Sequence, residues 1–181
     1  VRALLEARRR GKQVTAVVEL KARFDEEQNI NWAEELERAG VNVVYGFAGL
    51  KIHAKLCLVV RREPKGMRRY AHIGTGNYNA SSAKIYTDLG LFTARDDICS
   101  DVQDLFNVMT GFGVIDNYRR IFVSPNHLRA NITRLIREEA EIHRAKGGGR
   151  IIMKCNQLVD QGIVRELYEA SRAGVKIECV V

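Results

Sequence analysis

Cysteine is scarce in this sequence, and its spacing argues against the structures that cysteine usually builds. The four cysteines are Cys57, Cys99, Cys155 and Cys179, and no two of them form a C-x-x-C pair. This spacing gives no support for a zinc site or a disulfide framework. Because three of the four stand in apolar runs, we expect buried, reduced thiols, as in a cytosolic protein.

Long apolar runs are also missing. A transmembrane helix needs about 20 consecutive apolar residues, and no run in the sequence approaches that length. No charged segment precedes an apolar stretch near the start, as it would in a secretory signal. The sequence opens at Val1, inside a helical pattern and without Met, and closes at Val181, inside a strand pattern. We therefore expect a piece excised from a longer chain.

Positive charge, by contrast, is in excess. Lys and Arg number 29 against 22 Asp and Glu, which gives a net charge of +7 and a pI of about 9.4. This surplus favours polyanionic partners, although it also fits a basic soluble protein without such a partner. Apolar residues make up 46% of 181 positions, which is enough to build a core in one domain and part of another.

Hydrophobic periodicity alternates between the helical and the strand type, which predicts an α/β fold. Helical patterns cover residues 2–10, 32–38, 97–110 and 163–172, and a long charged helix ends near residue 146. His127 and His143 fall on that charged helix, where we expect solvated side chains. Strand patterns cover residues 14–20, 41–45, 55–61, 67–73, 85–93, 121–123, 150–155 and 175–181.

The sequence also resembles itself. Residues 1–18 and 164–181 match at nine of 18 positions without a gap, and residues 38–41 match 172–175. Each copy reads as a helix, a glycine and a strand, a unit that could also recur by chance in any α/β protein. We interpret the chain as one nearly complete domain over residues 1–117 and the beginning of a second, similar one over 118–181.

The histidine His53 stands between two lysines in Lys51-Ile-His-Ala-Lys55. On an extended strand these three side chains would project from one face. Two ammonium groups would lower the pKa of the imidazole and offset the charge of an anionic substrate, which suits a nucleophile that attacks phosphorus.

A glycine-rich turn follows the next strand pattern. It contains Gly74, Gly76 and Asn77, and His72 directly precedes it. Glycines there would let backbone N–H groups approach a phosphate, although a plain turn has the same composition. Asp88 lies in a β-rich run, where a carboxylate needs a partner. We expect it to orient His72 or the preceding motif's histidine, or else to cap a turn.

Together these motifs resemble the phospholipase D superfamily signature, in which H-x-K is followed by an Asp and then by G-[ST]-x-N. Val60 replaces the Asp, which argues against a standard phosphodiesterase. Longer strings around the same motifs, at residues 51–55, 70–79 and 86–93, resemble polyphosphate kinase, whose C-terminal half is a pair of phospholipase D-like domains. Residues 151–160 resemble the opening of the second one. The resemblance implies a mixed sheet with flanking helices.

The resemblance further implies Mg²⁺-dependent, reversible transfer of the ATP γ-phosphate to polyphosphate through a phosphohistidine. His53 then matches the phosphorylated histidine, with Lys55, His72, Asn77 and Asp88 in the same site. Tyr86 matches a nucleotide-contacting tyrosine, and Gly74 and Gly76 the phosphate turn. Arg23 matches an arginine assigned near the metal; since guanidinium has no free lone pair, we expect it to act through the phosphates.

The implied partners are ATP, ADP and inorganic polyphosphate in the cytoplasm, with no nucleic acid. The resemblance leaves room for a homo-oligomer and for peripheral membrane association of the full-length enzyme. Two other functions remain open: a phospholipase D-like phosphodiesterase or nuclease, and a non-catalytic polyanion-binding module. We expect the isolated chain to bind polyphosphate weakly and to sustain no turnover, because part of the cationic shell of the site would lie beyond Val181.

Overall fold

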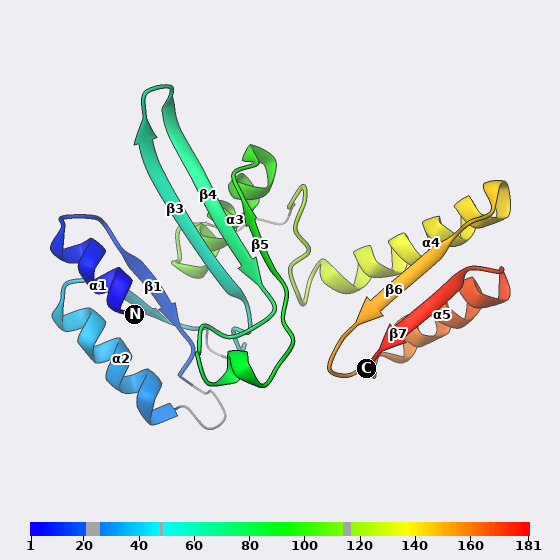
Figure 1. Ribbon diagram of the computed structural model, residues 1–181, viewed down its shortest axis with the longest axis horizontal. Helices are drawn as coiled ribbons and strands as arrows, with labels where there is room; N and C mark the ends of the chain where they lie inside the picture. Colours follow the sequence, from blue (N-terminus) through cyan, green and yellow to red (C-terminus); the bar gives the residue numbers. More distant parts are fainter. Residues whose placement is uncertain (21–25, 48, 114–116) are drawn as a thin grey trace. The chain divides into compact units, whose positions relative to one another are not determined.

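The computed structural model describes residues 1–20, 26–47, 49–113 and 117–181. Helices and strands alternate at both ends of the chain, around a central run of strands, and the strands pair in both parallel and antiparallel directions (Figure 1). The predicted α/β class with sheets and flanking helices is therefore confirmed, and within the described residues each sheet is either purely parallel or purely antiparallel. In the described part of the chain, no helix is long and apolar enough to cross a bilayer.

The first part of the chain is a small layer of two helices and two parallel strands. Strands β1 (Thr15–Val18) and β2 (Asn42–Tyr45) pair in parallel, and each follows a helix, α1 (Arg2–Arg9) or α2 (Glu26–Arg38). Both helices end before a glycine with positive φ, as do the matching residues later in the chain: φ is 75° at Gly11, 80° at Gly40 and 100° at Gly174. Glycine adopts this conformation without steric strain, which explains the repeated helix–glycine–strand pattern.

Next in the chain comes an antiparallel three-stranded sheet, in the order β3 (Lys55–Glu63), β4 (Gly66–Gly74) and β5 (Gly90–Thr93). Helix α3 (Asp96–Met109) covers one face of this sheet. There Cys99 and Val102 are buried against Ala71, with Leu58 and Ile73 packed beside them. Side chains alternate along a strand, so the cross-strand row Cys57, His72 and Phe92 belongs to the opposite face.

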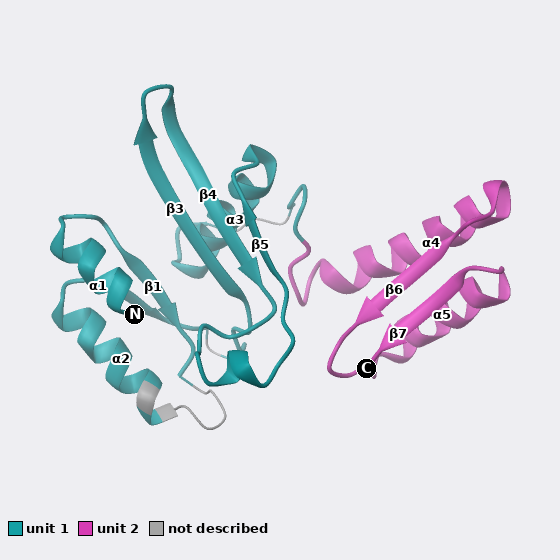
Figure 2. Cartoon of the chain, in the orientation of Figure 1, with its two compact units in different colours: residues 1–121 teal, residues 122–181 magenta. Residues whose placement is uncertain are grey.

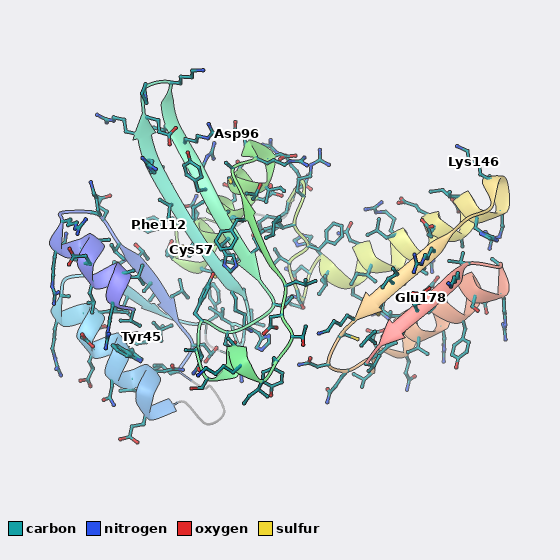
Figure 3. The ribbon with its side chains drawn as sticks, viewed as in Figure 1. Tyr45, Cys57, Asp96, Phe112, Lys146 and Glu178 are labelled. Atoms are coloured by element: carbon teal, nitrogen blue, oxygen red, sulfur yellow. The ribbon has the colours of Figure 1, made fainter. Side chains whose placement is uncertain are left out.

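The cysteines differ from the expectation of buried thiols. Cys99 is buried, Cys155 is half-buried, and Cys57 and Cys179 are exposed; Cys57 is labelled on β3 in Figure 3. The reason is that an apolar run in a strand has two faces, and only one of them packs against a helix here. Two of the predicted strands are absent or shorter in the structure. Residues 121–123 form no strand, and only Gly90–Thr93 of the strand predicted over 85–93 is regular.

The last part of the chain contains α4 (Leu128–Lys146), β6 (Arg150–Lys154), α5 (Gln161–Arg172) and β7 (Lys176–Val180), with β6 and β7 paired in parallel. Its core holds Ile136, Ile163 and Leu167. His143 is not simply solvated, as we had expected. Its Nδ1 accepts a hydrogen bond from the Gly149 N–H at 2.9 Å, which ties the end of α4 to the start of β6.

The chain divides into two compact units, residues 1–121 and 122–181 (Figure 2). The sequence placed this boundary at 117/118. Residues 118–121 stay with the first unit because the backbone N–H groups of Arg120 and Ile121 donate to the buried carboxylate of Asp101 at 2.6 and 3.2 Å. A buried carboxylate needs such donors, and the segment that supplies them is thereby anchored to α3.

Candidate functional site

Three segments that the sequence singled out meet at one end of the three-stranded sheet. The antiparallel register pairs Lys55, the first residue of β3, with Gly74, the last of β4. Gly74 in turn pairs with Gly90, the first residue of β5. The histidine motif runs into this row, the glycine-rich turn leaves it, and Asp88 lies two residues before the start of β5. The register thus brings together motifs that are up to about 35 residues apart in the sequence.

The Lys55 ammonium group is enclosed at this end of the sheet. Lys55 is only 8% exposed, and its Nζ donates to the backbone carbonyl oxygen of His53 at 2.6 Å. Burial lowers the pKa of Lys55, the negative charge of Asp88 raises it in part, and Lys51 lowers it again. The Lys55 ammonium group is therefore a positive charge that is hydrogen-bonded to the backbone of the histidine motif and is attracted by the Asp88 carboxylate.

His53 does not project from a strand. The prediction that Lys51, His53 and Lys55 share one strand face is wrong, because β3 begins at Lys55 and residues 51–54 have no regular structure. Both lysines still act on the imidazole. Burial lowers the pKa of His53, and the positive charges of Lys55 and then Lys51 lower it further. The neutral ring, with a lone pair available for attack, is thereby favoured near neutral pH.

Asp88 is bound by Thr75 and not by a histidine. The Thr75 hydroxyl donates to Asp88 Oδ1 at 2.9 Å and accepts from the Leu89 N–H at 3.0 Å. The Thr75 N–H donates to the Leu89 carbonyl at 3.0 Å. These bonds join the glycine-rich turn to the segment before β5. Among the hydrogen bonds of the described residues, the expected pairing of Asp88 with a histidine N–H is absent, because its carboxylate faces the turn.

Contacts within the protein explain why the site has glycine at positions 74, 76 and 90. A Cβ atom at Gly76 would lie 2.3 Å from Asp88 Oδ2, and one at Gly90 would lie 2.7 Å from His72 Nε2. A Cβ atom at Gly74 would lie 3.0 Å from His72 Cε1. Real Cβ atoms essentially never come closer than 3.0 Å to another heavy atom, and 3.0 Å is already unusually tight. Missing side chains at these positions therefore make room for the carboxylate and the imidazole, whether or not a phosphate also approaches.

His72 has a polar partner of its own. Its Nδ1 shares a hydrogen bond with the Tyr78 hydroxyl at 2.7 Å, and its ring lies 4.4 Å, between centroids, from the ring of Phe92. Burial and the neighbouring Cys57 thiol raise the pKa of Tyr78, which keeps the phenol protonated. His72 is thus held by Tyr78 and Phe92, on the sheet face opposite α3.

The other predicted residues are placed less closely. Asn77 lies in the turn, where its carbonyl oxygen accepts from the Asn79 N–H at 2.7 Å. Tyr86 follows the 3₁₀ helix η1 (Ser82–Lys84) and is 62% exposed, so its ring is open to a ligand. Arg23, expected near the metal, lies outside the described residues.

The magnesium ion that the resemblance implies would need ligand atoms from the residues of this site. Among the described residues, no group of three or more His, Cys, Asp or Glu side chains is placed to hold a metal. The charges that act on His53 are ammonium groups, and the Asp88 carboxylate is bound to Thr75. Since Mg²⁺ requires several oxygen ligands, these residues do not fit a magnesium ion by themselves. They suit the oxygens of a phosphate.

Sequence analysis missed one residue that touches the site. Glu19 directly follows β1, and its Oε2 accepts a hydrogen bond from the Ile52 N–H, next to His53, at 2.8 Å. A signal was present in the sequence. A carboxylate at the carboxyl end of a parallel strand stands where α/β proteins commonly place functional groups.

Comparisons with known proteins agree along the whole chain. The family described as "Polyphosphate kinase C-terminal domain 1" matches residues 1–115, and "Polyphosphate kinase C-terminal domain 2" matches residues 121–181. The polyphosphate kinase of Mycolicibacterium paratuberculosis is 54% identical over all 181 residues, and so is polyphosphate kinase 1 of Chlorobaculum tepidum. The chain covers 25% and 26% of these two proteins, so it spans about a quarter of the length of its curated relatives.

A solved structure is similar as well. The crystal structure of polyphosphate kinase from Porphyromonas gingivalis matches 99% of this chain with a TM-score of 0.86 and 38% sequence identity. The match covers 28% of that protein.

Proposed function

The chain belongs to the polyphosphate kinase family, and on that premise we propose that it carries the phosphoryl-accepting histidine of an ATP:polyphosphate phosphotransferase. In this proposal the γ-phosphate of ATP passes to His53 and then to the end of a polyphosphate chain, and both steps are reversible. The first unit acts as a phospholipase D-like catalytic domain, and residues from the second unit onward begin another. ATP, ADP and polyphosphate are the partners.

One observation carries this proposal: at the end of a sheet, the imidazole of His53 lies beside the ammonium groups of Lys55 and Lys51, which favour its neutral form. Burial, Lys55 and Lys51 all lower the pKa of His53. The ring nitrogen can therefore attack the γ-phosphorus, so that an N–P bond forms while the bond from phosphorus to the β,γ-bridging oxygen breaks and ADP leaves. The terminal oxygen of polyphosphate then attacks the same phosphorus, and the N–P bond breaks.

Lys55 and Lys51 supply the positive charge that this transfer needs. The migrating phosphoryl group spreads negative charge over its oxygens, and fixed cations nearby stabilise it. Lys55 is held in place by its hydrogen bond to the His53 carbonyl, and Asp88 lies within its field. Removing one such group typically lowers the rate by about 10²–10³, which is the loss we expect for Lys55→Ala.

The remaining residues bind and orient the substrates. Asn77 and the turn around Gly76 donate to phosphate oxygens, and the exposed Tyr86 contacts the nucleotide. The Thr75 N–H is already bonded to Leu89, so it takes no part. Mg²⁺, when bound with the nucleotide, would neutralise phosphate charge; in this proposal it is held through the phosphates, and no residue of the site has to ligate it.

The test is to incubate the full-length protein with γ-labelled ATP and Mg²⁺ and to map phosphohistidine under alkaline conditions. We expect label on His53, lost in His53→Ala and kept in His72→Ala. Lys65→Ala changes an exposed lysine in the turn between β3 and β4, at the opposite end of the hairpin from Lys55; it serves as the matched control for Lys55→Ala and should label normally. Label that is kept in His53→Ala and lost in His72→Ala would transfer the nucleophile to His72. Polyphosphate binding without any label would favour a non-catalytic polyanion-binding module.

A further inference from the structure

The segment that carries His53 is held by side chains and not by a sheet. Residues 51–54 lie between the β-bridge Phe47–Leu50 and the start of β3, without regular structure. Within the described residues, two side chains hold this segment by hydrogen bonds to its backbone. Lys55 Nζ donates to the His53 carbonyl at 2.6 Å, and the Ile52 N–H donates to Glu19 Oε2 at 2.8 Å. The second bond is the more informative, because Glu19 lies 33 residues away in the sequence.

Glu19 is well placed to hold its neighbour. It is half-buried directly after β1, and its own backbone carbonyl accepts from the Asn29 side chain at 3.2 Å, which links it to α2. Its carboxylate lies against Gly46, just past the end of β2, where a Cβ atom would be 3.9 Å from Oε2. Glu19 also lines a cavity of about 500 Å³ together with Phe47 and Lys51. The carboxylate therefore reaches from β1, past β2, to the histidine segment.

We infer that Glu19 is a positioning residue for His53: by accepting the Ile52 N–H it sets where the adjacent imidazole stands. The inference deepens the proposed function and rests on it. A hydrogen bond from a backbone N–H to a carboxylate is short and stronger than a neutral one. Glu19 acts through the backbone and does not touch the substrate. Displacing a reacting group by about 1 Å can lower a rate by about 10², so this bond has a large effect on the reaction.

Two substitutions separate the reach of the Glu19 side chain, meaning its length, from its charge. Glu19→Gln keeps the reach, and its amide oxygen can still accept from Ile52, but the charge is gone. Glu19→Asp keeps the charge but withdraws the carboxylate by about 1.5 Å, one C–C bond. If the role is positioning, Glu19→Gln should phosphorylate His53 within about threefold of the wild type at saturating ATP. Glu19→Asp should be slower by about tenfold or more, with little change in the ATP concentration for half-maximal rate.

A second measurement does not depend on phosphorylation. The ring pKa of His53 can be followed by NMR in the 181-residue chain labelled at histidine. Among the described residues, the charges that lower this pKa are those of Lys55 and Lys51, which flank His53 in the sequence. We expect Glu19→Gln to leave the pKa of His53 low, and Glu19→Asp to let it rise toward its ordinary value as the segment moves into water. Glu6→Ala, which removes an exposed ion pair on α1, is the matched control and should change neither measurement.

The outcomes test the positioning role of Glu19 and the proposed function separately. An impaired Glu19→Gln beside a normal Glu19→Asp would assign an electrostatic role and overturn the inference, as would two normal variants. Fluorescence of Trp32, the single tryptophan, confirms that each variant folds. If wild-type His53 takes no label, the proposed function fails. The NMR comparison of Glu19→Gln with Glu19→Asp then still supports or overturns the positioning of the segment.

Discussion

Replacing Gly76 with alanine should displace Asp88. The added Cβ atom would lie 2.3 Å from Asp88 Oδ2 and 2.5 Å from its Cγ, whereas ordinary contacts begin at 3.4 Å. Gly76 is not among the glycines with positive φ, so alanine adds no backbone strain. The collision is therefore with the side chain of Asp88, chiefly with its carboxylate, and that side chain must retreat by about 1 Å.

The retreat breaks the bond between Asp88 and Thr75. Their oxygens are 2.9 Å apart, and a further 1 Å or so takes the pair beyond hydrogen-bond range. A hydrogen bond to a charged group contributes about 1.5–3 kcal/mol when it is shielded from water. Both residues here are exposed, so we expect Gly76→Ala to reduce the free energy of unfolding of the first unit by about 1 kcal/mol.

The assay is urea unfolding of the 181-residue chain followed by Trp32 fluorescence. Trp32 is the single tryptophan and lies on α2, so the signal reports the first unit. Gly113→Ala is the matched control, because no atom of the residues that the structure describes lies within 4 Å of its added Cβ atom. We expect that control to change the free energy of unfolding by less than about 0.5 kcal/mol.

A double-mutant cycle tests the reasoning directly. If alanine at position 76 acts by displacing the Asp88 carboxylate, then Gly76→Ala should cost clearly less in an Asp88→Ala background, where only the contact with the Cβ atom of residue 88, at 3.0 Å, remains. An equal loss in both backgrounds would refute this account of the glycine. In the full-length protein, Gly76→Ala should also slow the phosphorylation of His53, because it displaces the Asp88 carboxylate, whose negative charge acts on Lys55.

Two further predictions concern the second unit. The Arg129 guanidinium, through its hydrogen bond, lowers the pKa of Asp160 from 3.8 to about 2. Because the folded pKa is the lower one, the stability that this carboxylate provides is complete above about pH 4 and is lost as the pH falls toward 2. The protection factors of amides in α5, which take out the intrinsic dependence of exchange on pH, should therefore fall over that range in the wild type and less so in Asp160→Asn. Gly174→Ala should lower the stability of the second unit by about 1–3 kcal/mol, measured by amide exchange in β6 and β7. Its φ is 100° and its Cβ atom would lie 2.6 Å from His143 Nε2. An unchanged exchange rate would contradict this.

The sequence by itself determined the order and type of the long elements. The helix predicted over residues 97–110 is Asp96–Met109, and the strands predicted over 55–61 and 67–73 form the β3–β4 hairpin. These elements could be predicted because periodicity and glycine conformation are local properties. The motifs around His53 and Gly74 were visible for the same reason, since each is a short string of residues.

Only the tertiary structure decided which partner each side chain has. Asp88 is bound to Thr75, and Lys55 to the His53 carbonyl, because the register of β3, β4 and β5 brings those segments together. Glu19 reaches Ile52 across 33 residues, and Cys57 is exposed because α3 packs against the other face of its sheet. A periodic pattern shows that a strand has two faces. Which face is covered, and what a polar group meets there, depends on contacts between residues far apart in the chain.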